Sequence, residues 1–290
     1  KVYVDGKLEN QGTLGSLPAS PGSVPVYIGR YPNSSVELFK GPIDEVRTYN
    51  YERASGQIVE DMNAGHPAPG SPIGSPISYW KLDQGYGTTA NNSISGQPNF
   101  ALTASPNDPA WTQSGKFGKA LDFDGAASVT SEDYADATFT AATWDQGTLS
   151  LWIRPNSLPG SEYYPISNYN GVVGEAGGWL VAIGSDGSCS IRGNAVYTDA
   201  CPVGSFAANT WTHLVFVVDK TNAVRKIYIN GLLKATYTSN TYGFRINSTL
   251  RMGMGSWCDT SSDCIYPGVL DEVKLYNSAL TPDQVKLEYN

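Results

Sequence analysis

Charged residues, and clusters of basic residues in particular, are common in intracellular and nucleic-acid-binding proteins but scarce in this sequence. Charged residues make up only 16% of its 290 positions, against about a quarter in an average globular protein. The net charge is −8, and no cluster of lysine or arginine occurs. Nucleic acid binding needs such clusters, so this class of function is excluded. No stretch approaches the roughly 20 apolar residues that cross a membrane, so we expect no membrane insertion in this segment.

Cysteine and histidine are also scarce, with four and two residues respectively. Four cysteines allow three disulfide pairings. The short spacings favour the pairs Cys189–Cys201 and Cys258–Cys264. Free thiols or a zinc site are the alternatives, although zinc usually requires closer CxxC-type pairs or neighbouring histidines. Disulfides would be typical of a secreted or cell-surface protein.

What the sequence does contain is an internal repeat. "KVYVDG" at residues 1–6 returns as "KIYING" at 226–231, and "GPIDEVRTYNYERASGQI" at 41–58 returns as "GVLDEVKLYNSALTPDQV" at 268–285. The beginning of the chain therefore corresponds to the end of a module that the chain also carries in full. The repeat predicts that the parent protein holds such modules in tandem.

The repeat predicts a division of the chain into three parts. Residues 1–64 are the C-terminal part of one module, residues 65–76 are a Pro/Gly linker, and residues 77–290 are a complete module. Three strands and a helix would leave strand edges unpaired and half a core open. We therefore expect residues 1–64 to need strands from a complementing chain or another copy.

Strand patterns dominate the complete module. Residues 147–155 alternate apolar and polar positions, and 211–219 form a short apolar run. Residues 225–238 predict a hairpin that turns at Asn230 and Gly231. Residues 268–276 predict another strand. A short helix is predicted after Thr281, with Pro282 at its first position and Gln284 completing a capping box. Such a composition favours an all-β antiparallel sandwich of two sheets.

Six segments of the complete module carry a resemblance to a known family, and they occur in that family's order. They are "YWKLDQGYGTTANNSISG", "GKFGKALDFDG", "LSLWIRP", "WTHLVFVVDK", "IYINGLL" and "LDEVKLYNSALTPDQV". The chain resembles laminin-G-like (LamG-like) jelly-roll domains of the concanavalin A-like lectin/glucanase superfamily. The resemblance covers nearly all of 77–290, and residues 1–64 match the family's C-terminal third. It implies a two-sheet jelly roll used for adhesion or carbohydrate recognition, often secreted and often bound to calcium.

Calcium is the only cofactor that we expect. In related jelly rolls, an acidic residue near the first strand and an aspartate of the last strand share a structural calcium ion with backbone carbonyls. The matching residues are Asp83 and Asp271, with Asp124 as a further candidate. The alternatives are that Asp271 accepts backbone N–H hydrogen bonds and that Asp124 caps a turn.

Enzymatic activity is not expected. His213 has no evident serine or cysteine partner, and its apolar neighbours indicate a packed setting. The members of the superfamily that cut β-glucans carry an ExDxxE or ExDxE motif on one strand, and this sequence lacks it. The string "SEDYADA" at residues 131–137 does not reproduce it.

Aromatic side chains in two polar stretches are the candidate ligand-binding residues, because a pyranose ring stacks on tyrosine or tryptophan. The alternative is that these rings cover the edge of the sandwich. The candidates are Tyr163, Tyr164, Tyr169, Trp257 and Tyr266.

We therefore expect a non-catalytic, secreted or cell-surface module for adhesion or recognition. Its partner would be a glycan or another surface protein. A structural repeat of an extracellular filament and a carbohydrate-binding module attached to an enzyme outside this segment are the alternatives.

Overall fold

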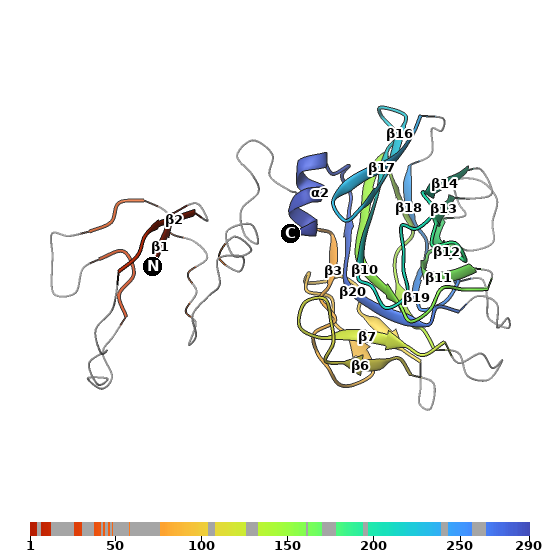
Figure 1. Ribbon diagram of the computed structural model, residues 1–290, viewed down its shortest axis with the longest axis horizontal. Coiled ribbons are helices and arrows are strands. Elements are labelled where there is room, and N and C mark those ends of the chain that lie inside the picture. Colours follow the sequence, from red (N-terminus) through yellow and green to blue (C-terminus); the bar gives the residue numbers. More distant parts are fainter. Residues whose placement is uncertain are drawn as a thin grey trace. The chain divides into compact units, whose positions relative to one another are not determined.

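The structure is a computed structural model, shown in Figure 1. It describes residues 1–4, 7–12, 26–30, 38–41, 43, 46, 48, 58, 76–103, 108–125, 133–160, 162–169, 178–193, 197–238, 243–256 and 265–290. The chain divides into two compact units, Lys1–Gly70 (unit 1) and Ser71–Asn290 (unit 2). Trp257, Cys258 and Cys264 lie outside the described residues.

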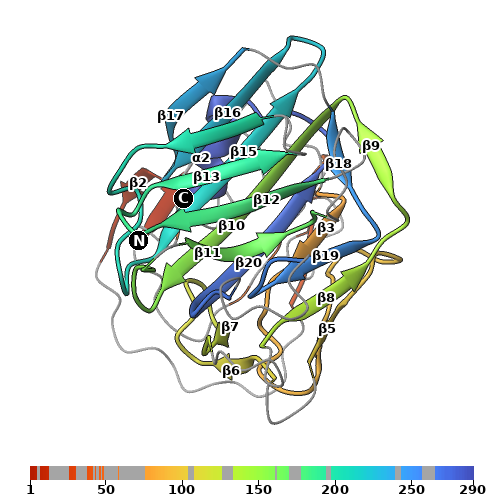
Figure 2. The same cartoon turned by 90° about the vertical axis from the view of Figure 1, so that its right-hand side faces the viewer.

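Unit 2 is a sandwich of two antiparallel sheets, which Figures 1 and 2 show from two sides. Sheet 1 has the order β17-β16-β15-β10-β20-β7-β6, and β3 also pairs with β20. Its strands are β17 (Leu232–Tyr237), β16 (Val224–Ile229), β15 (Thr212–Asp219), β10 (Gln146–Pro155), β20 (Gly268–Tyr276), β7 (Ala120–Phe123), β6 (Ala110–Thr112) and β3 (Ser78–Trp80).

Sheet 2 has the order β14-β13-β12-β11-β19-β8-β5-β4 and faces the viewer in Figure 2. Its strands are β14 (Tyr197–Cys201), β13 (Cys189–Gly193), β12 (Trp179–Gly184), β11 (Glu162–Ser167), β19 (Thr249–Met252), β8 (Ala135–Thr138), β5 (Phe100–Leu102) and β4 (Thr89–Ala90). A separate strand pair joins β18 (Phe244–Ile246) to β9 (Ala142–Trp144). The predicted all-β, two-sheet jelly-roll architecture is confirmed.

The core of unit 2 lies between the two sheets. The alternation predicted for residues 147–155 is confirmed, because Leu149, Leu151 and Ile153 of β10 all lie in this core. The opposite face of β10 is buried too. The ring of Trp152 packs against Phe117 and stacks on Tyr289, with centroids 6.0 and 5.5 Å apart. Sheet 1 is therefore covered on its outer side.

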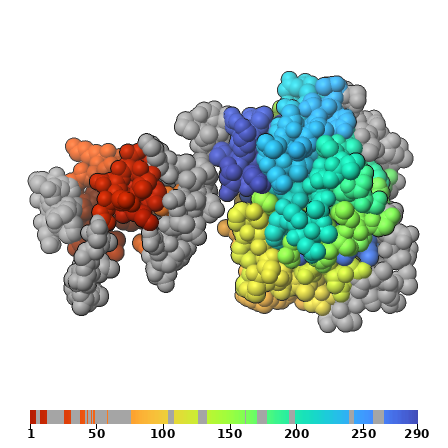
Figure 3. Space-filling view, in the orientation of Figure 1, coloured from red at the N-terminus to blue at the C-terminus, as the bar shows by residue number. Residues whose placement is uncertain are grey.

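The helix α2 (Pro282–Tyr289) provides part of that cover. It begins with the predicted capping box: the Thr281 hydroxyl accepts a hydrogen bond from the Gln284 N–H, and the Gln284 side chain accepts one from the Thr281 N–H. Val285 is buried against the outer side of sheet 1. Lys274 donates to Glu288 at 2.8 Å. Figure 3 shows α2, in dark blue, at the surface of unit 2 beside the light-blue strands.

An extra residue in β20 sets the direction of its acidic side chains. The pairing of β20 with β10 shifts register between Ser150 and Trp152, and Glu272 has a φ of 51°. Because of this bulge, Leu270 and Val273 both face the core although they are three residues apart. Asp271 therefore lies on the outer side of sheet 1, opposite Trp152.

One edge of the sandwich is closed by contacts between the two sheets. Arg225 of β16 and Asp199 of β14 form a buried ion pair, with Nε–Oδ2 and Nη2–Oδ1 distances of 2.5 and 2.9 Å. The Tyr237 hydroxyl of β17 donates to the carbonyl of Ala200 and accepts from its N–H. These contacts join β14, the outermost strand of sheet 2, to β16 and to β17, the outermost strand of sheet 1.

A disulfide joins Cys189 of β13 to Cys201 of β14 at directly opposed positions. The first predicted cysteine pair is therefore confirmed. The second, Cys258–Cys264, stays a prediction because it falls outside the described part of the chain.

Unit 1 is described over short stretches only. They contain the hairpin of β1 (Val2–Val4) and β2 (Lys7–Asn10), and an isolated bridge between Arg30 and Leu38. Many of the apolar side chains described in this unit are exposed, including Val26 and Phe39.

Candidate functional site

The two aspartates predicted to bind calcium both bind the backbone of residues 115–119. Oδ1 of Asp83 accepts a hydrogen bond from the Lys119 N–H at 2.9 Å. Oδ2 of Asp271 accepts one from the Phe117 N–H at 3.0 Å. Gly118, between Phe117 and Lys119, has a φ of 64°, and a Cβ at this position would lie 2.3 Å from Oδ1 of Asp83. The carboxylates thus hold one tight loop.

The electrostatics of Asp271 are those of a buried carboxyl group. Burial raises its pKa to about 8, although the N–H of Phe117 favours the charged form, and the neighbouring Glu272 raises the pKa further. Carboxylate oxygens suit calcium. Among the described residues, however, no group of three or more His, Cys, Asp or Glu side chains is placed to hold a metal ion. A cation beside Asp83 and Asp271 would therefore need backbone carbonyl oxygens as further ligands.

Asp124, the third predicted ligand, is exposed and lies beside a different acidic side chain. Its backbone N–H donates to Oδ2 of Asp133 at 2.7 Å. Asp133 is buried, and burial raises its pKa to about 7 in spite of this hydrogen bond. The sequence analysis missed Asp133, which is embedded in the polar "SEDYADA" stretch and gives no pattern that distinguishes it from a solvent-facing residue.

His213 lies in the packed setting that the sequence predicts, and the structure adds a partner that the sequence analysis did not find. The Ser150 hydroxyl lies 2.9 Å from Nε2 of His213, and both residues are buried. Burial lowers the pKa of His213 to about 3, and the charges of Lys274 and Lys116 contribute. Nδ1 has no hydrogen-bond partner among the described residues. Ser150 and His213 thus form a hydrogen-bonded pair inside the packed setting that the sequence predicts for His213.

Of the five candidate aromatic residues, Tyr266 is a core residue. Its side chain is fully buried and contacts the rings of Phe123 and Tyr163, with centroids 6.5 and 6.4 Å away. No face of this ring is open to a ligand. Tyr163 is half-buried and packs on the same core. These two rings thus pack into the core of the sandwich, which differs both from an open sugar platform and from the predicted alternative of rings that cover its edge.

Tyr164 points the other way from Tyr163, as alternation along a strand requires. Its hydroxyl donates to Oε2 of Glu162 at 2.8 Å. Tyr169 is half-buried just after β11, and its N–H donates to the Ser167 hydroxyl at 3.3 Å. Trp257 lies outside the described residues. Tyr164 and Tyr169 are thus the described candidates that are partly exposed and do not pack on the core between the sheets.

Tyr164 belongs to a group of side chains on the outer side of sheet 2, the side that faces the viewer in Figure 2. Arg192 of β13 donates to both oxygens of Glu162, with an Nη1–Oε2 distance of 2.9 Å. The two side chains are 35% and 30% exposed, so their remaining polar atoms reach solvent. Although burial acts to raise it, hydrogen bonds from Arg192 and Tyr164 hold the pKa of Glu162 below its usual value.

A second guanidinium–carboxylate pair lies on the same side of the sheet. Arg251 of β19 is directly opposite Asp136 of β8, and its Nε and Nη2 donate to the carboxylate at 2.8 and 2.9 Å. The guanidinium carbon lies 3.9 Å from the ring centroid of Tyr134. Met254 packs against both Tyr134 and Tyr164 and so connects the two pairs. We call these six residues the polar face: Tyr134, Asp136, Glu162, Tyr164, Arg192 and Arg251.

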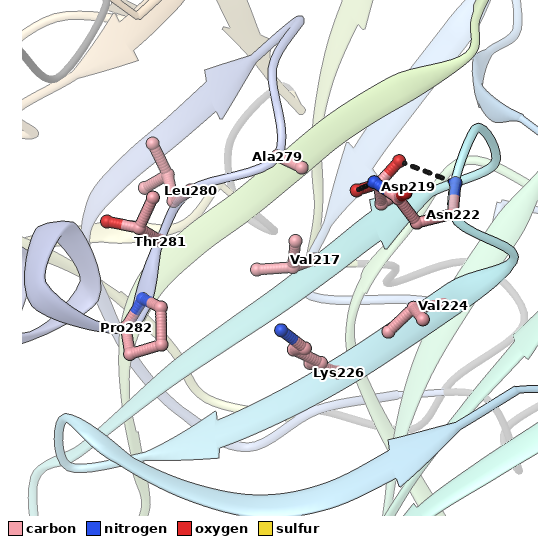
Figure 4. A pocket seen from close by; sticks show the side chains of 9 residues that line it. All are labelled: Val217, Asp219, Asn222, Val224, Lys226, Ala279, Leu280, Thr281 and Pro282. Atoms are coloured by element: carbon pink, nitrogen blue, oxygen red, sulfur yellow. Dashed lines mark hydrogen bonds between the residues drawn. The ribbon is translucent and has the colours of Figure 1, made fainter. Parts of the chain in front are cut away.

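Elsewhere on unit 2, described residues line two further cavities. The one in Figure 4 has a volume of about 280 Å³ and lies between β15, β16 and residues 279–282. Asp219 and Asn222 in its lining are already paired, because the Asn222 amide donates to Asp219 at 2.6 Å, and Gln146 beside the cavity also donates to Asp219 at 3.1 Å. These hydrogen bonds lower the pKa of Asp219 although burial opposes them.

The other cavity is larger, about 520 Å³, and is lined by the aromatic rings of Phe139 and Trp144. Ile77 and Pro98 add apolar surface, and Gln97 adds an amide group. We call it the Trp144 cavity. It combines an apolar wall with a few polar groups, which is the usual composition of a small-molecule site.

The sequence model of the concanavalin A-like lectin/glucanases superfamily matches residues 1–59 and 122–286 of this chain. No curated protein matches the sequence. No helix among the described residues is long and apolar enough to cross a membrane.

Solved structures share the fold at low sequence identity. Domain 4 of AbnA, a GH43 extracellular arabinanase from Geobacillus stearothermophilus in complex with arabinotriose, is 21% identical with a TM-score of 0.53, covering 74% of this chain and 98% of that one. The ligand-binding domain of botulinum neurotoxin serotype D in complex with N-acetylneuraminic acid is 13% identical with a TM-score of 0.54. The binding domain of serotype G is 16% identical with a TM-score of 0.53. The match covers 74% of this chain and 50% of each toxin chain.

Proposed function

The chain belongs to the concanavalin A-like lectin/glucanase superfamily, and we propose that unit 2 is a non-catalytic module that binds an oligosaccharide on its polar face. The observation that carries this proposal is the pair of guanidinium–carboxylate groups, each in contact with a tyrosine, on one side of sheet 2. Sheet strands hold these groups in place, so little ordering is lost when a ligand binds.

The chemistry of the polar face favours a neutral sugar. Arginine and carboxylate side chains together offer donors and acceptors to neighbouring hydroxyl groups, and a tyrosine ring offers an apolar surface. Arg192 and Arg251 are each matched by a carboxylate, so the polar face carries no surplus positive charge for an acidic sugar. The similar arabinanase domain was solved with arabinotriose, which supports a neutral oligosaccharide as the first ligand to test.

Titration calorimetry with arabinotriose on the full chain tests the proposal. Arg192→Ala should weaken binding by about tenfold or more, since a hydrogen bond to a charged group contributes about 1.5–3 kcal/mol. Tyr164→Ala should also weaken binding, because the sugar loses the apolar surface of the ring. Lys220→Ala is the matched control, because Lys220 belongs to the solvent-exposed ion pair with Asp145 at 3.3 Å. It should bind like the wild type.

Sialyllactose is the second ligand in the same experiment. Arabinotriose binding that Arg192→Ala leaves unchanged would contradict the assignment to the polar face. Tight binding of sialyllactose without any of arabinotriose would contradict the preference for neutral sugars. Melting temperatures of all variants, measured beside the titrations, separate a lost contact from a lost fold.

We also propose that calcium binds beside Asp83 and Asp271. Support comes from the buried Asp271 carboxyl and from the loop of residues 115–119, whose backbone could supply further oxygen ligands. Chelation by EDTA should then lower the melting temperature, and Asp271→Ala should remove that sensitivity. A melting curve that EDTA leaves unchanged would exclude the site.

We further propose that the protein is exported from the cell. The Cys189–Cys201 disulfide supports an oxidising compartment, because such bonds are rare in the cytosol. The Cys258–Cys264 pair stays a prediction. Non-reducing peptide mapping of protein from its native host should find both pairs, and a link between Cys189 and Cys258 would contradict the assignment.

A further inference from the structure

Unit 1 repeats the closing strands of unit 2 in hydrogen bonding as well as in sequence. Val4 pairs with Lys7 in unit 1 as Ile229 pairs with Leu232 in unit 2. The irregularity of the β1–β2 hairpin recurs at the same place: Val2 lies opposite Asn10, just as Ile227 lies opposite Ala235. β1 and β2 therefore pair in the same register as β16 and β17.

A second turn is repeated in the same way. Gly29 and Gly253 both adopt positive φ, 78° and 85°. The carbonyl of Gly29 accepts from the Phe39 N–H at 2.9 Å, and that of Gly253 accepts from the Tyr266 N–H at 2.8 Å. An isolated bridge follows each glycine, Arg30 with Leu38 and Met254 with Ile265. The described parts of unit 1 thus repeat two backbone features of the closing strands of unit 2.

What differs between the two copies is burial. Five apolar residues of unit 1 are between 47% and 61% exposed, whereas their equivalents in unit 2 are at most 3% exposed. The equivalent pairs are Val2 and Ile227, Val4 and Ile229, Ile28 and Met252, Ile43 and Leu270, and Val46 and Val273. In unit 2 these positions pack against core residues from the 77–225 segment. That segment already has β16, β17 and β20 as its partner strands.

We propose that this apolar side of unit 1 is an interaction surface for a second jelly-roll body, meaning a set of strands with the pattern of residues 77–225. Such a body presents core-facing apolar residues like those of β10 and β15, and it pairs its last strand with a β16-type hairpin. The surface should not accept unrelated apolar ligands equally well, because strand pairing and side-chain packing must match in register.

The repeat supplies a direct test on the full chain. A second copy of residues 77–225 is fused ahead of Lys1, so that Lys1 follows Arg225 as Lys226 does in unit 2. Hydrogen–deuterium exchange is then compared between the fused chain and the original chain. Amides of unit 1 should exchange at least about 100-fold more slowly in the fused chain. Exchange in unit 2 should be unchanged, which serves as the internal control for folding.

Two substitutions in the fused chain make the test specific. Ile43→Asp places a charge at a position whose equivalent, Leu270, is fully buried, and it should abolish the added protection. Leu8→Asp is the matched control, because Leu8 and its equivalent Leu233 are 42% and 49% exposed. It should leave the protection intact.

Three results would overturn the proposal. One is that the amides of unit 1 are as protected from exchange in the original chain as in the fused chain, because the apolar surface would then be buried without a second body. Dimerisation of the original chain through unit 1 would have the same meaning. Another is the absence of added protection in the fused chain. The third is equal loss of protection with Leu8→Asp and Ile43→Asp. None of these results depends on oligosaccharide binding by unit 2.

Discussion

The buried ion pair between Arg225 and Asp199 should be one of the most sensitive points of unit 2. It links β16 of sheet 1 to β14 of sheet 2, and the two side chains are 4% and 1% exposed. Asp199→Ala would leave a guanidinium group buried without its carboxylate. Breaking a buried pair from one side typically costs about 3–5 kcal/mol of the free energy of unfolding. We expect a loss in this range.

Urea unfolding followed by tryptophan fluorescence measures this loss in unit 2 alone, because every tryptophan of the chain lies beyond residue 70. Asp145→Ala breaks the exposed ion pair with Lys220 and should cost about 1 kcal/mol or less. The double substitution Asp199→Leu with Arg225→Met removes both charges and should recover most of the stability. A loss below about 1 kcal/mol for Asp199→Ala would refute the reasoning.

Three further predictions concern single features of unit 2. As the pH drops from 6.5 towards 3, the free energy of unfolding of the wild type should fall relative to that of His213→Gln by about 1.4 kcal/mol per pH unit. The reason is that His213 takes up a proton near pH 6.5 in the unfolded chain, whereas burial keeps its imidazole neutral down to about pH 3 in the folded chain, where its pKa is about 3. Parallel stability curves for the two proteins would contradict this. Gly118→Ala should destabilise unit 2 by about 2 kcal/mol more than Gly87→Ala, since both glycines have positive φ but only the first has an atom in the way of a Cβ; equal urea midpoints would argue against a tight loop. Replacing Cys189 and Cys201 together by serine should cost about 3 kcal/mol, the chain-entropy value for a loop of this length, and an unchanged melting temperature would show that the disulfide adds nothing.

Much of the fold could be predicted from local sequence patterns. The alternation around Leu151 places β10, the Asn230-Gly231 turn places the β16–β17 hairpin, and the capping box at Thr281 places the start of α2. Each of these signals lies within a few residues of the chain, where periodicity and turn chemistry act directly. The Cys189–Cys201 pair has the same local character.

The polar face could not be predicted in this way. Arg192, Glu162, Arg251 and Asp136 come from four different strands, and only the strand order of sheet 2 brings them to one side. Sequence reasoning turned instead to aromatic stretches, where Tyr164 belongs to the polar face but Tyr266 fills the core. A residue in a polar, loop-like stretch can still be buried when the sandwich folds over it.

The central claim, that unit 2 binds an oligosaccharide on its polar face, is tested most directly by mapping the binding surface. Arabinotriose is titrated into isotope-labelled full-length protein, and the amide and arginine side-chain NMR shifts are followed. We predict that the largest changes occur at Arg192, Tyr164 and Arg251, with an affinity that agrees with calorimetry. Shifts confined to the Trp144 cavity, or no shifts with arabinotriose at millimolar concentration, would contradict the claim.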